Sequence, residues 1–297
     1  MDDVTRRGAL RRRSAGASLE RQVVGQQWAQ GLVDCRPDGS PTQHLASTIE
    51  LHVVPRLVLA HRANQVQRPD GPANERRPSA EVEELARLVV SHDMSVAMSF
   101  IEARRGRGTS LESIYLNLLA PAARYLGQMW AEDWCDFTAV TLGLGRLHQI
   151  VRELSPAFQN EAKHEDHGRQ VLLAAAPDEQ HTFGLSMVAE FFRRAGWTVR
   201  CVSSAGCEEL VQLVRDEWFA IVGISVGCEV KLEGLAGQIY ALRRASRNRA
   251  MGVMVGGQVF VQRPELVGLV GADATAVDGR QACLQAECML AMAAHRT

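Results

Sequence analysis

Five short apolar runs in the second half of the chain alternate with amphipathic segments, and this alternation limits the possible folds more than any other feature. Each run has the length of a buried strand, and apolar residues recur at helical spacing in the segments between them. Such alternation is typical of a parallel sheet with helices on both faces. It predicts a flavodoxin-like (Rossmann-type) doubly wound α/β domain with strand order 2-1-3-4-5. The predicted strands are 170–176, 197–202, 219–225, 251–255 and 273–277, with helices beginning near residues 182, 206, 230, 258 and 279.

The loop after the first predicted strand carries the most informative polar residues. It contains Glu179, His181 and Gly184 in the pattern Glu-x-His-x-x-Gly. In an open α/β sheet, loops that follow the strands lie at the ligand-binding edge. A lone histidine here is more often an exposed loop residue or a partner of the helix N-terminus. The neighbouring carboxylate, which would fix the imidazole tautomer, and the glycine, which lets a bulky ligand approach, favour a metal-binding histidine.

This motif resembles the Asp-x-His-x-x-Gly signature of cobalamin-binding domains. Ser225 and the pair Gly256–Gly257 resemble two further elements of that signature. They lie at the ends of the third and fourth predicted strands. The resemblance implies base-off, His-on cobalamin, with His181 as the cobalt ligand, Ser225 bonded to the buried base and the glycine pair leaving room for the tail. The α/β residues that it implies for the cofactor are Glu179, His181, Gly184, Ser225, Val226, Gly256 and Gly257.

The identity of the metal cofactor has one alternative. Glu179 stands where most cobalamin-binding domains have Asp, and its additional methylene changes the geometry of a carboxylate–imidazole hydrogen bond. Haem iron also accepts a histidine ligand, so the Glu-x-His pattern alone leaves haem open. Ser225 and the glycine pair would serve a nucleotide tail that haem lacks, and they favour cobalamin.

The rest of the composition is that of an ordinary globular protein. The 297 residues have a formal net charge of −1, 46 % are hydrophobic, and no run approaches a membrane span or a secretory signal. We therefore expect a cytoplasmic protein without membrane contact. Residues 1–78 are predicted to form an arm, a helix and a linker. In this region His44, His52 and His61 are either ordinary histidines or a second axial ligand.

Residues 79–160 are predicted to form a helical bundle ahead of the α/β domain, which is assigned to 168–297. Trp130 and Trp134 fall near the end of its second helix. Each of them either packs in the core or, as the resemblance implies, covers the upper face of the corrin ring. Of the two, Trp130 is the predicted cofactor contact. Three main helices are predicted. The first runs from a Ser79 cap to about Arg105, and the second runs from a capping box at Thr109–Glu112, past a kink at Pro121, to about Glu132. The third runs from an Asp136 cap to Ser155–Pro156.

Segments 55–62, 125–133 and 137–141 resemble the AerR/PpaA antirepressors of photosystem genes. This resemblance covers roughly residues 45–297 and implies a light-responsive regulator, not an enzyme, acting through a DNA-bound repressor of the CrtJ/PpsR type. Because no helix-turn-helix pattern is found, DNA contact is expected to be indirect or weak. Light-sensing repressors that take adenosylcobalamin carry Trp-x9-Glu-His, where this chain has Val140-Thr141, so adenosyl recognition is not implied. A corrinoid methyl carrier for a methyltransferase and a haem redox sensor are the alternatives.

Overall fold

The structure, a computed structural model, describes residues 78–161, 169–177, 179, 182–202, 206–227, 232 and 234–294. The predictions for residues 1–77, including His44, His52 and His61, lie outside these ranges. In the part of the chain that is described, no helix combines the length and apolarity needed to cross a membrane.

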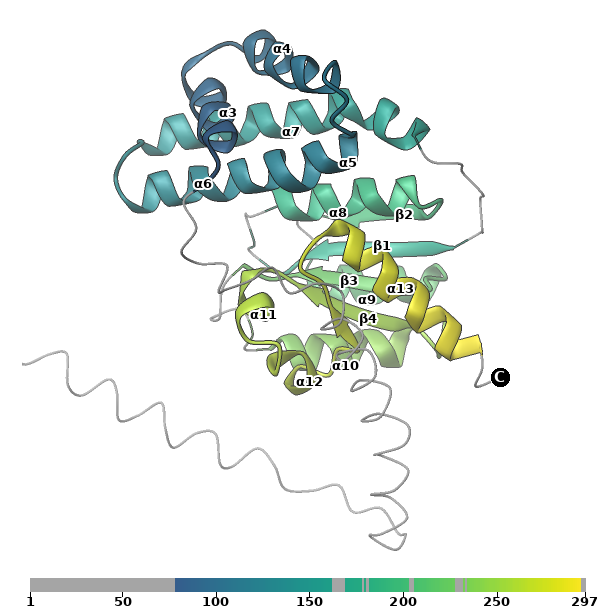
Figure 1. The fold of residues 1–297 in the computed structure, drawn as a ribbon. Coiled ribbons are helices and arrows are strands. Elements are labelled where there is room, and N and C mark those ends of the chain that lie inside the picture. The colour runs from purple at the N-terminus through teal and green to yellow at the C-terminus, as the bar shows by residue number, and fades with distance from the viewer. Residues whose placement is uncertain are drawn as a thin grey trace, which may run out of the picture. The chain divides into compact units, whose positions relative to one another are not determined.

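A helical bundle comes first in the described chain, and its elements lie side by side in Figure 1. Its core consists of fully buried aliphatic side chains together with Tyr115 and Phe158. The bundle elements are α3 (Ala80–Ser91), α4 (Met94–Arg105), α5 (Leu111–Ile114), the π-helical turn η3 (Tyr115–Leu119), α6 (Ala120–Ala131) and α7 (Phe137–Asn160).

The first predicted bundle helix is wrong in its length, because the chain forms two helices there. Ser79 caps α3 as predicted, its side chain accepting a hydrogen bond from the N–H of Val82. His92 and Asp93 are then extended before α4 begins. The break lets each short helix turn its own apolar side inward, since Val89 of α3 and Ile101 of α4 are both fully buried.

The kink predicted at Pro121 takes the form of a π-helical turn. Ser110, and not Thr109, caps the preceding helix by accepting from the N–H of Ser113. The N–H of Ala120 then bonds to the carbonyl of Tyr115, five residues earlier. Because proline has no N–H to donate, this shift of register comes where the α-helical ladder must change.

The third bundle helix is longer than predicted. Asp136 caps α7 through its Oδ1, which lies 2.7 Å from the N of Ala139, but the helix passes through Pro156 and ends at Asn160. The ring of Phe158 is fully buried and stacks on Tyr115, with centroids 4.2 Å apart. This packing outweighs the helical hydrogen bond that proline removes.

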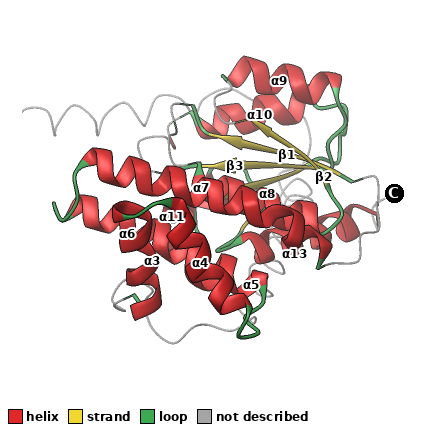
Figure 2. Ribbon diagram, turned by 90° about the horizontal axis from the view of Figure 1, so that it is seen from above, coloured by secondary structure: helices red, strands yellow, loops and turns green. Residues whose placement is uncertain are grey.

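The α/β part is a five-stranded parallel sheet in the order β2-β1-β3-β4-β5, as predicted. Helices α8 and α13 cover one face and α9 and α10 the other (Figure 2). The elements are β1 (Gln170–Ala175), α8 (Phe183–Arg194), β2 (Thr198–Val202), α9 (Cys207–Asp216), β3 (Ile221–Ser225), α10 (Leu235–Ala245), β4 (Gly252–Gly256), α11 (Gln258–Gln262), α12 (Leu266–Leu269), β5 (Ala274–Thr275) and α13 (Gly279–Ala294).

Helix α8 belongs to both cores. One side of it packs on the sheet and α13, and the opposite side packs into the bundle, mainly against α7. In Figure 1 it therefore lies between the bundle and the strands. The sheet-facing side chains are Leu185, Ala189 and Phe192, and the bundle-facing ones are Phe183, Met187 and Phe191.

Candidate functional site

Three central strands end side by side in small residues. The register pairs Ala175 of β1 with Ser225 of β3, and Ser225 with Gly256 of β4. Ala175 packs in the core beneath α8 and α13, and residues in register point to the same face of a sheet, so this row lies on the α8 side. The carboxyl ends of β1, β3 and β4 therefore carry only small side chains on the α8 side of the sheet.

The two glycines of the pair Gly256–Gly257 have different roles. Gly257 has φ 115°, and a Cβ atom there would collide with the carbonyl of Val226, so the fold itself requires glycine. A Cβ atom on Gly256 would meet nothing within 4 Å. Val226, fully buried, donates its N–H to the carbonyl of Gly256 at 2.9 Å. Gly256 is thus the position where the missing side chain leaves open space.

Glu179 is buried at this edge, with 6 % of its surface exposed. Its backbone N–H donates to the carbonyl of Ala176 at 3.0 Å. Its Oε2 accepts a hydrogen bond from the N–H of Gly227 at 2.6 Å, which joins the loop after β1 to the loop after β3. The predicted contact between Glu179 and His181 concerns a residue outside the described ranges and stays a prediction.

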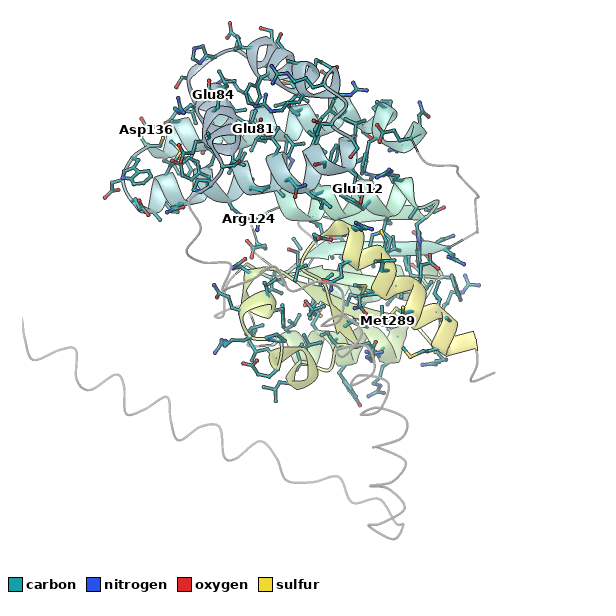
Figure 3. The ribbon with its side chains drawn as sticks, viewed as in Figure 1. Glu81, Glu84, Glu112, Arg124, Asp136 and Met289 are labelled. Carbon is teal, nitrogen blue, oxygen red and sulfur yellow. The ribbon has the colours of Figure 1, made fainter. Side chains whose placement is uncertain are left out.

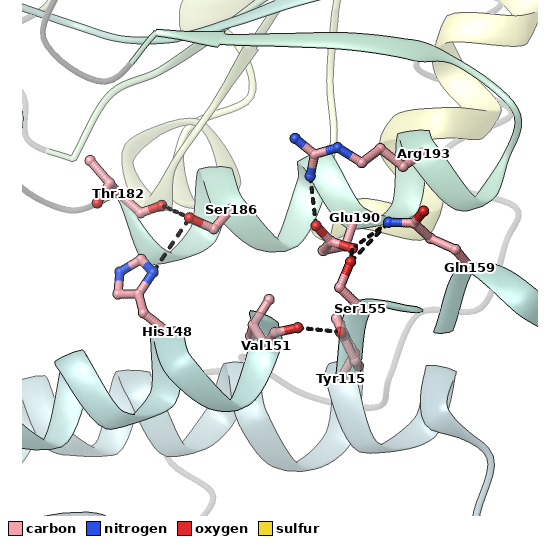
Figure 4. Close-up of polar contacts among 9 residues, drawn as sticks. All are labelled: Tyr115, His148, Val151, Ser155, Gln159, Thr182, Ser186, Glu190 and Arg193. Atoms are coloured by element: carbon pink, nitrogen blue, oxygen red, sulfur yellow. Dashed lines mark hydrogen bonds and ion pairs between the residues drawn. The ribbon is translucent and has the colours of Figure 1, made fainter. Parts of the chain in front are cut away.

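The helix that follows the motif makes its first contacts with the bundle. The ring of His148 on α7 lies edge-on to Phe183, with centroids 5.1 Å apart, and its Nδ1 is 3.5 Å from the Oγ of Ser186. Further along, Glu190 accepts from the Oγ of Ser155 at 2.5 Å and pairs with Arg193 (Figure 4). Burial lowers the pKa of His148, which favours the neutral imidazole.

These contacts also fix the direction of α7. Both His148 to Ser186 and Ser155 to Glu190 run forward along the two helices, so α7 and α8 are parallel. Residues 137–147 of α7 therefore continue past the start of α8 by roughly 16 Å, at about 1.5 Å per residue. The turn between α6 and α7 accordingly lies on the side of the sheet where β1 ends, as Figure 1 shows.

This projecting end of the bundle exposes aromatic side chains. Trp130 is 53 % exposed and Trp134 57 %, so neither is packed in the core. Trp134 meets Tyr125 edge-on with centroids 6.5 Å apart, and Phe137 beyond it is 71 % exposed. Exposed aromatic side chains beyond the carboxyl edge are suited to pack against a large planar ligand.

Arg124 is a candidate site residue that the sequence reasoning missed. It lies on α6, and Figure 3 places it between the bundle and the α/β elements. Arg124 is exposed, and the carboxylate of Asp278, in the loop after β5, acts electrostatically to favour its charged form. The sequence of this helix shows only an apolar face, so nothing in it indicates a role for Arg124. Only the fold brings Arg124 near the loops of the sheet.

The structure brings most of the predicted site residues to one region. Glu179, Ser225 and the glycine pair lie at the carboxyl edge, with Val226 between the strand ends. Gly184 is the second residue of α8, and a Cβ atom on it would meet nothing within 4 Å. The open positions at Gly184 and Gly256 fit a bulky ligand approaching the backbone. Trp130 lies on the bundle, and its distance from such a ligand is a prediction.

Comparison with protein families and known sequences gives two findings. Residues 169–286 match the family model described as "B12 binding domain". The chain is also 31 % identical over 169 residues to a Rhodobacter capsulatus protein described as an uncharacterized 20.5 kDa protein in the bchF-crtJ intergenic region. That alignment covers 57 % of this chain and 88 % of the relative.

Among solved structures, the monomethylamine corrinoid protein of Methanosarcina barkeri is similar to this chain with a TM-score of 0.59. The match covers 70 % of this chain and 96 % of that protein, at 14 % sequence identity. At this identity the likeness concerns the fold, a helical region followed by a parallel sheet that alternates with helices.

Proposed function

Because this chain is a B12-binding domain protein of the same family as the Rhodobacter capsulatus protein, we propose that it is a cobalamin-binding regulator of transcription. The observation that carries this proposal is the coincidence of the matched domain, residues 169–286, with the row of small residues at the carboxyl edge. Bound cobalamin supplies a cobalt centre whose axial ligand can be exchanged, including by light. The protein's own residues hold it and pass on its state.

Each part of the cofactor has a group of residues to hold it in this proposal. His181 would bind the cobalt, and Glu179 would hold the loop between β1 and α8 in place. Ser225 and the open position at Gly256 receive the nucleotide tail on the α8 side of the sheet. Trp130, which is exposed on the bundle, would cover the ring on the side away from His181. Haem has no nucleotide tail to occupy the space at Gly256, which supports cobalamin over the haem alternative.

Helix α8 is the proposed connection between cofactor and bundle. His181 lies two residues before Phe183, the first residue of α8, and Phe183 packs against His148 of the bundle. A change of ligation that moves the motif loop would shift the start of α8 and so the packing of α7. Because α8 is buried in both cores, such a shift would require the bundle and the α/β domain to repack against each other.

The proposed partner is a DNA-bound repressor of the CrtJ/PpsR type, which the protein would antagonise without reading DNA itself. The relative from the bchF-crtJ intergenic region supports this choice, because its described location adjoins crtJ. An enzymatic role as corrinoid methyl carrier is the competing proposal. The Methanosarcina barkeri likeness does not favour it, since 14 % identity speaks for the fold only.

The experiment that tests this function combines binding with regulation. Purified protein is mixed with hydroxocobalamin or haem, separated from free cofactor, and its absorption spectrum is recorded before and after illumination. The same samples are added to a complex of the repressor with its DNA. We expect a corrinoid spectrum and weaker repressor–DNA binding in one light state. Equal repressor affinity in light and dark contradicts the regulator, and methylation of the bound cobalt by a methyl donor with its methyltransferase supports the carrier.

A further inference from the structure

The hydrogen bond between Glu179 and Gly227 joins two loops at the carboxyl edge, and nothing in the Glu-x-His pattern predicts it. Gly227 follows β3 by two residues, and its N–H donates to Glu179 Oε2 at 2.6 Å. A hydrogen bond to a carboxylate is short and strong, and shielding from water strengthens it further. Since Glu179 is only 6 % exposed, this bond fixes the spacing between the two loops.

The absence of a side chain at Gly227 is part of this contact. A Cβ atom at Gly227 would lie 2.6 Å from Oε2 and 3.0 Å from the carboxyl carbon of Glu179. Because Glu179 is only 6 % exposed, its carboxylate has little solvent-filled space to move into, and its backbone N–H is bonded to Ala176. Ala176 is in turn bonded through its own N–H to the carbonyl of Ser225 at 2.8 Å. The loop after β1 is therefore tied to β3 through both backbone and side chain.

We propose that Glu179 and Gly227 form a strap that holds the loops after β1 and β3 at a fixed spacing, so that cobalamin binding depends on Gly227 having no side chain. This inference rests on the proposed function. Glu179 acts here as a positioning residue whose carboxylate is held by the backbone that follows Ser225. The strap thereby links the loop after β1 to the strand end at Ser225, which in the proposed function would receive the nucleotide tail.

The length of the Glu179 side chain provides the test. Gly227→Ala places a methyl group against the carboxylate, and Glu179→Asp withdraws the carboxylate from the Gly227 N–H by one carbon–carbon bond, about 1.5 Å. Each single variant is expected to weaken hydroxocobalamin affinity by about 10- to 100-fold, the usual effect of losing a partner that orients a metal ligand. In the double variant the shorter carboxylate makes room for the methyl group, so part of the affinity and of the His-ligated absorption spectrum returns.

Two controls separate the strap from a general loss of folding. Gly237→Ala on α10, where an added Cβ meets nothing within 4 Å, should bind cobalamin like the wild type. Hydrogen exchange of the Gly227 amide is measured in the cofactor-free protein, where it should be slow in the wild type and in Gly237→Ala. It should be faster in Glu179→Ala, and this readout requires no cofactor.

The outcomes are distinguishable. A wild-type protein that binds no cobalamin contradicts the proposed function and, with it, any role of the strap in ligation. A wild-type protein that binds cobalamin while Gly227→Ala keeps full affinity and the same spectrum overturns the strap alone. So does a double variant in which the two losses simply add, because residues in contact should show coupling.

Discussion

The imidazole of His148 lies edge-on to the ring of Phe183, with centroids 5.1 Å apart and an interplanar angle of 83°. Phe183 is the first residue of α8 and follows the proposed cobalt ligand by two positions. The contact therefore joins a bundle side chain to the residue that begins α8, directly after the motif loop. A signal that leaves the loop along the chain meets the bundle first at this pair of rings.

His148 should make the stability of the protein depend on pH. Burial, followed by the charge of Arg152, lowers the pKa of His148 in the folded state below the unfolded value of about 6.5. The unfolded chain then binds the proton more readily, so the free energy of unfolding falls as the pH drops below about 6.5 toward the folded pKa. Thermal unfolding at about pH 7.5 and 5.5 should show a larger loss on acidification for the wild type than for His148→Gln. Equal losses would remove His148 from this explanation.

The two glycines at the end of β4 should give opposite phenotypes. Gly256→Val places a side chain in open space, so the cofactor-free protein should unfold within about 0.5 kcal/mol of the wild type while cobalamin binding is lost. Gly257→Ala combines a φ of 115° with a collision against Val226 and should be destabilised by more than about 1 kcal/mol. Chemical denaturation and cobalamin titration of both variants check this. A stable Gly256→Val protein with unchanged affinity would show that the tail lies elsewhere.

Trp130 should affect the cofactor and leave folding unchanged. Because half of its surface is exposed, Trp130→Ala is expected to alter the free energy of unfolding by less than about 0.5 kcal/mol. Removing the indole opens the upper face of the ring, so cyanide should replace the upper ligand of bound hydroxocobalamin faster. Trp218→Ala is the matched control, since Trp218 is 44 % exposed in the connection that precedes β3. Identical cyanide rates in both variants would argue against Trp130 as a cover.

Glu112 should connect the bundle to the α/β helices. Its carboxylate lies 2.8 Å from Arg194 Nη1 on α8 and 3.5 Å from Arg280 Nε on α13. Because Glu112 and Arg194 are only partly buried and Arg280 is exposed, Glu112→Gln is expected to cost no more than about 1 kcal/mol, with a cost that shrinks at high salt. Glu84→Gln, which removes an exposed pair with Arg87 within one helix, should cost close to nothing. Denaturant unfolding at low and high salt compares the two variants.

The sheet could be predicted from the sequence because its signals are local. Each apolar run and each helical spacing is confined to one element, their alternation predicts a parallel sheet, and the structure confirms the flavodoxin-like strand order chosen for it. The third bundle helix shows the limit of this reasoning. Pro156 is a local stop signal, but Phe158 packs on Tyr115, more than forty residues away, and the helix continues. Tertiary packing overrode a signal that was correct in isolation.

The sequence allowed prediction of those site residues that belong to a recognisable motif. Ser225 and the glycine pair could be proposed because they resemble signature elements of cobalamin-binding domains, and the structure confirms that the strand ends carrying them are neighbours. Gly227 and Arg124 could not, because neither belongs to a motif. The role of Gly227 comes from a carboxylate that reaches across two loops, and the electrostatic interaction of Arg124 with Asp278 arises only because the fold brings α6 near the loop after β5.

Electron paramagnetic resonance of protein-bound cob(II)alamin tests the central claim most directly, with histidine in the protein labelled with ¹⁵N and His181→Ala alongside. If a protein imidazole is the lower ligand, the nitrogen splitting of the cobalt signal changes from a triplet to a doublet on labelling, and it disappears in His181→Ala. A triplet that persists in the labelled wild-type protein would mean that the cofactor keeps its own base, and would contradict base-off binding through His181.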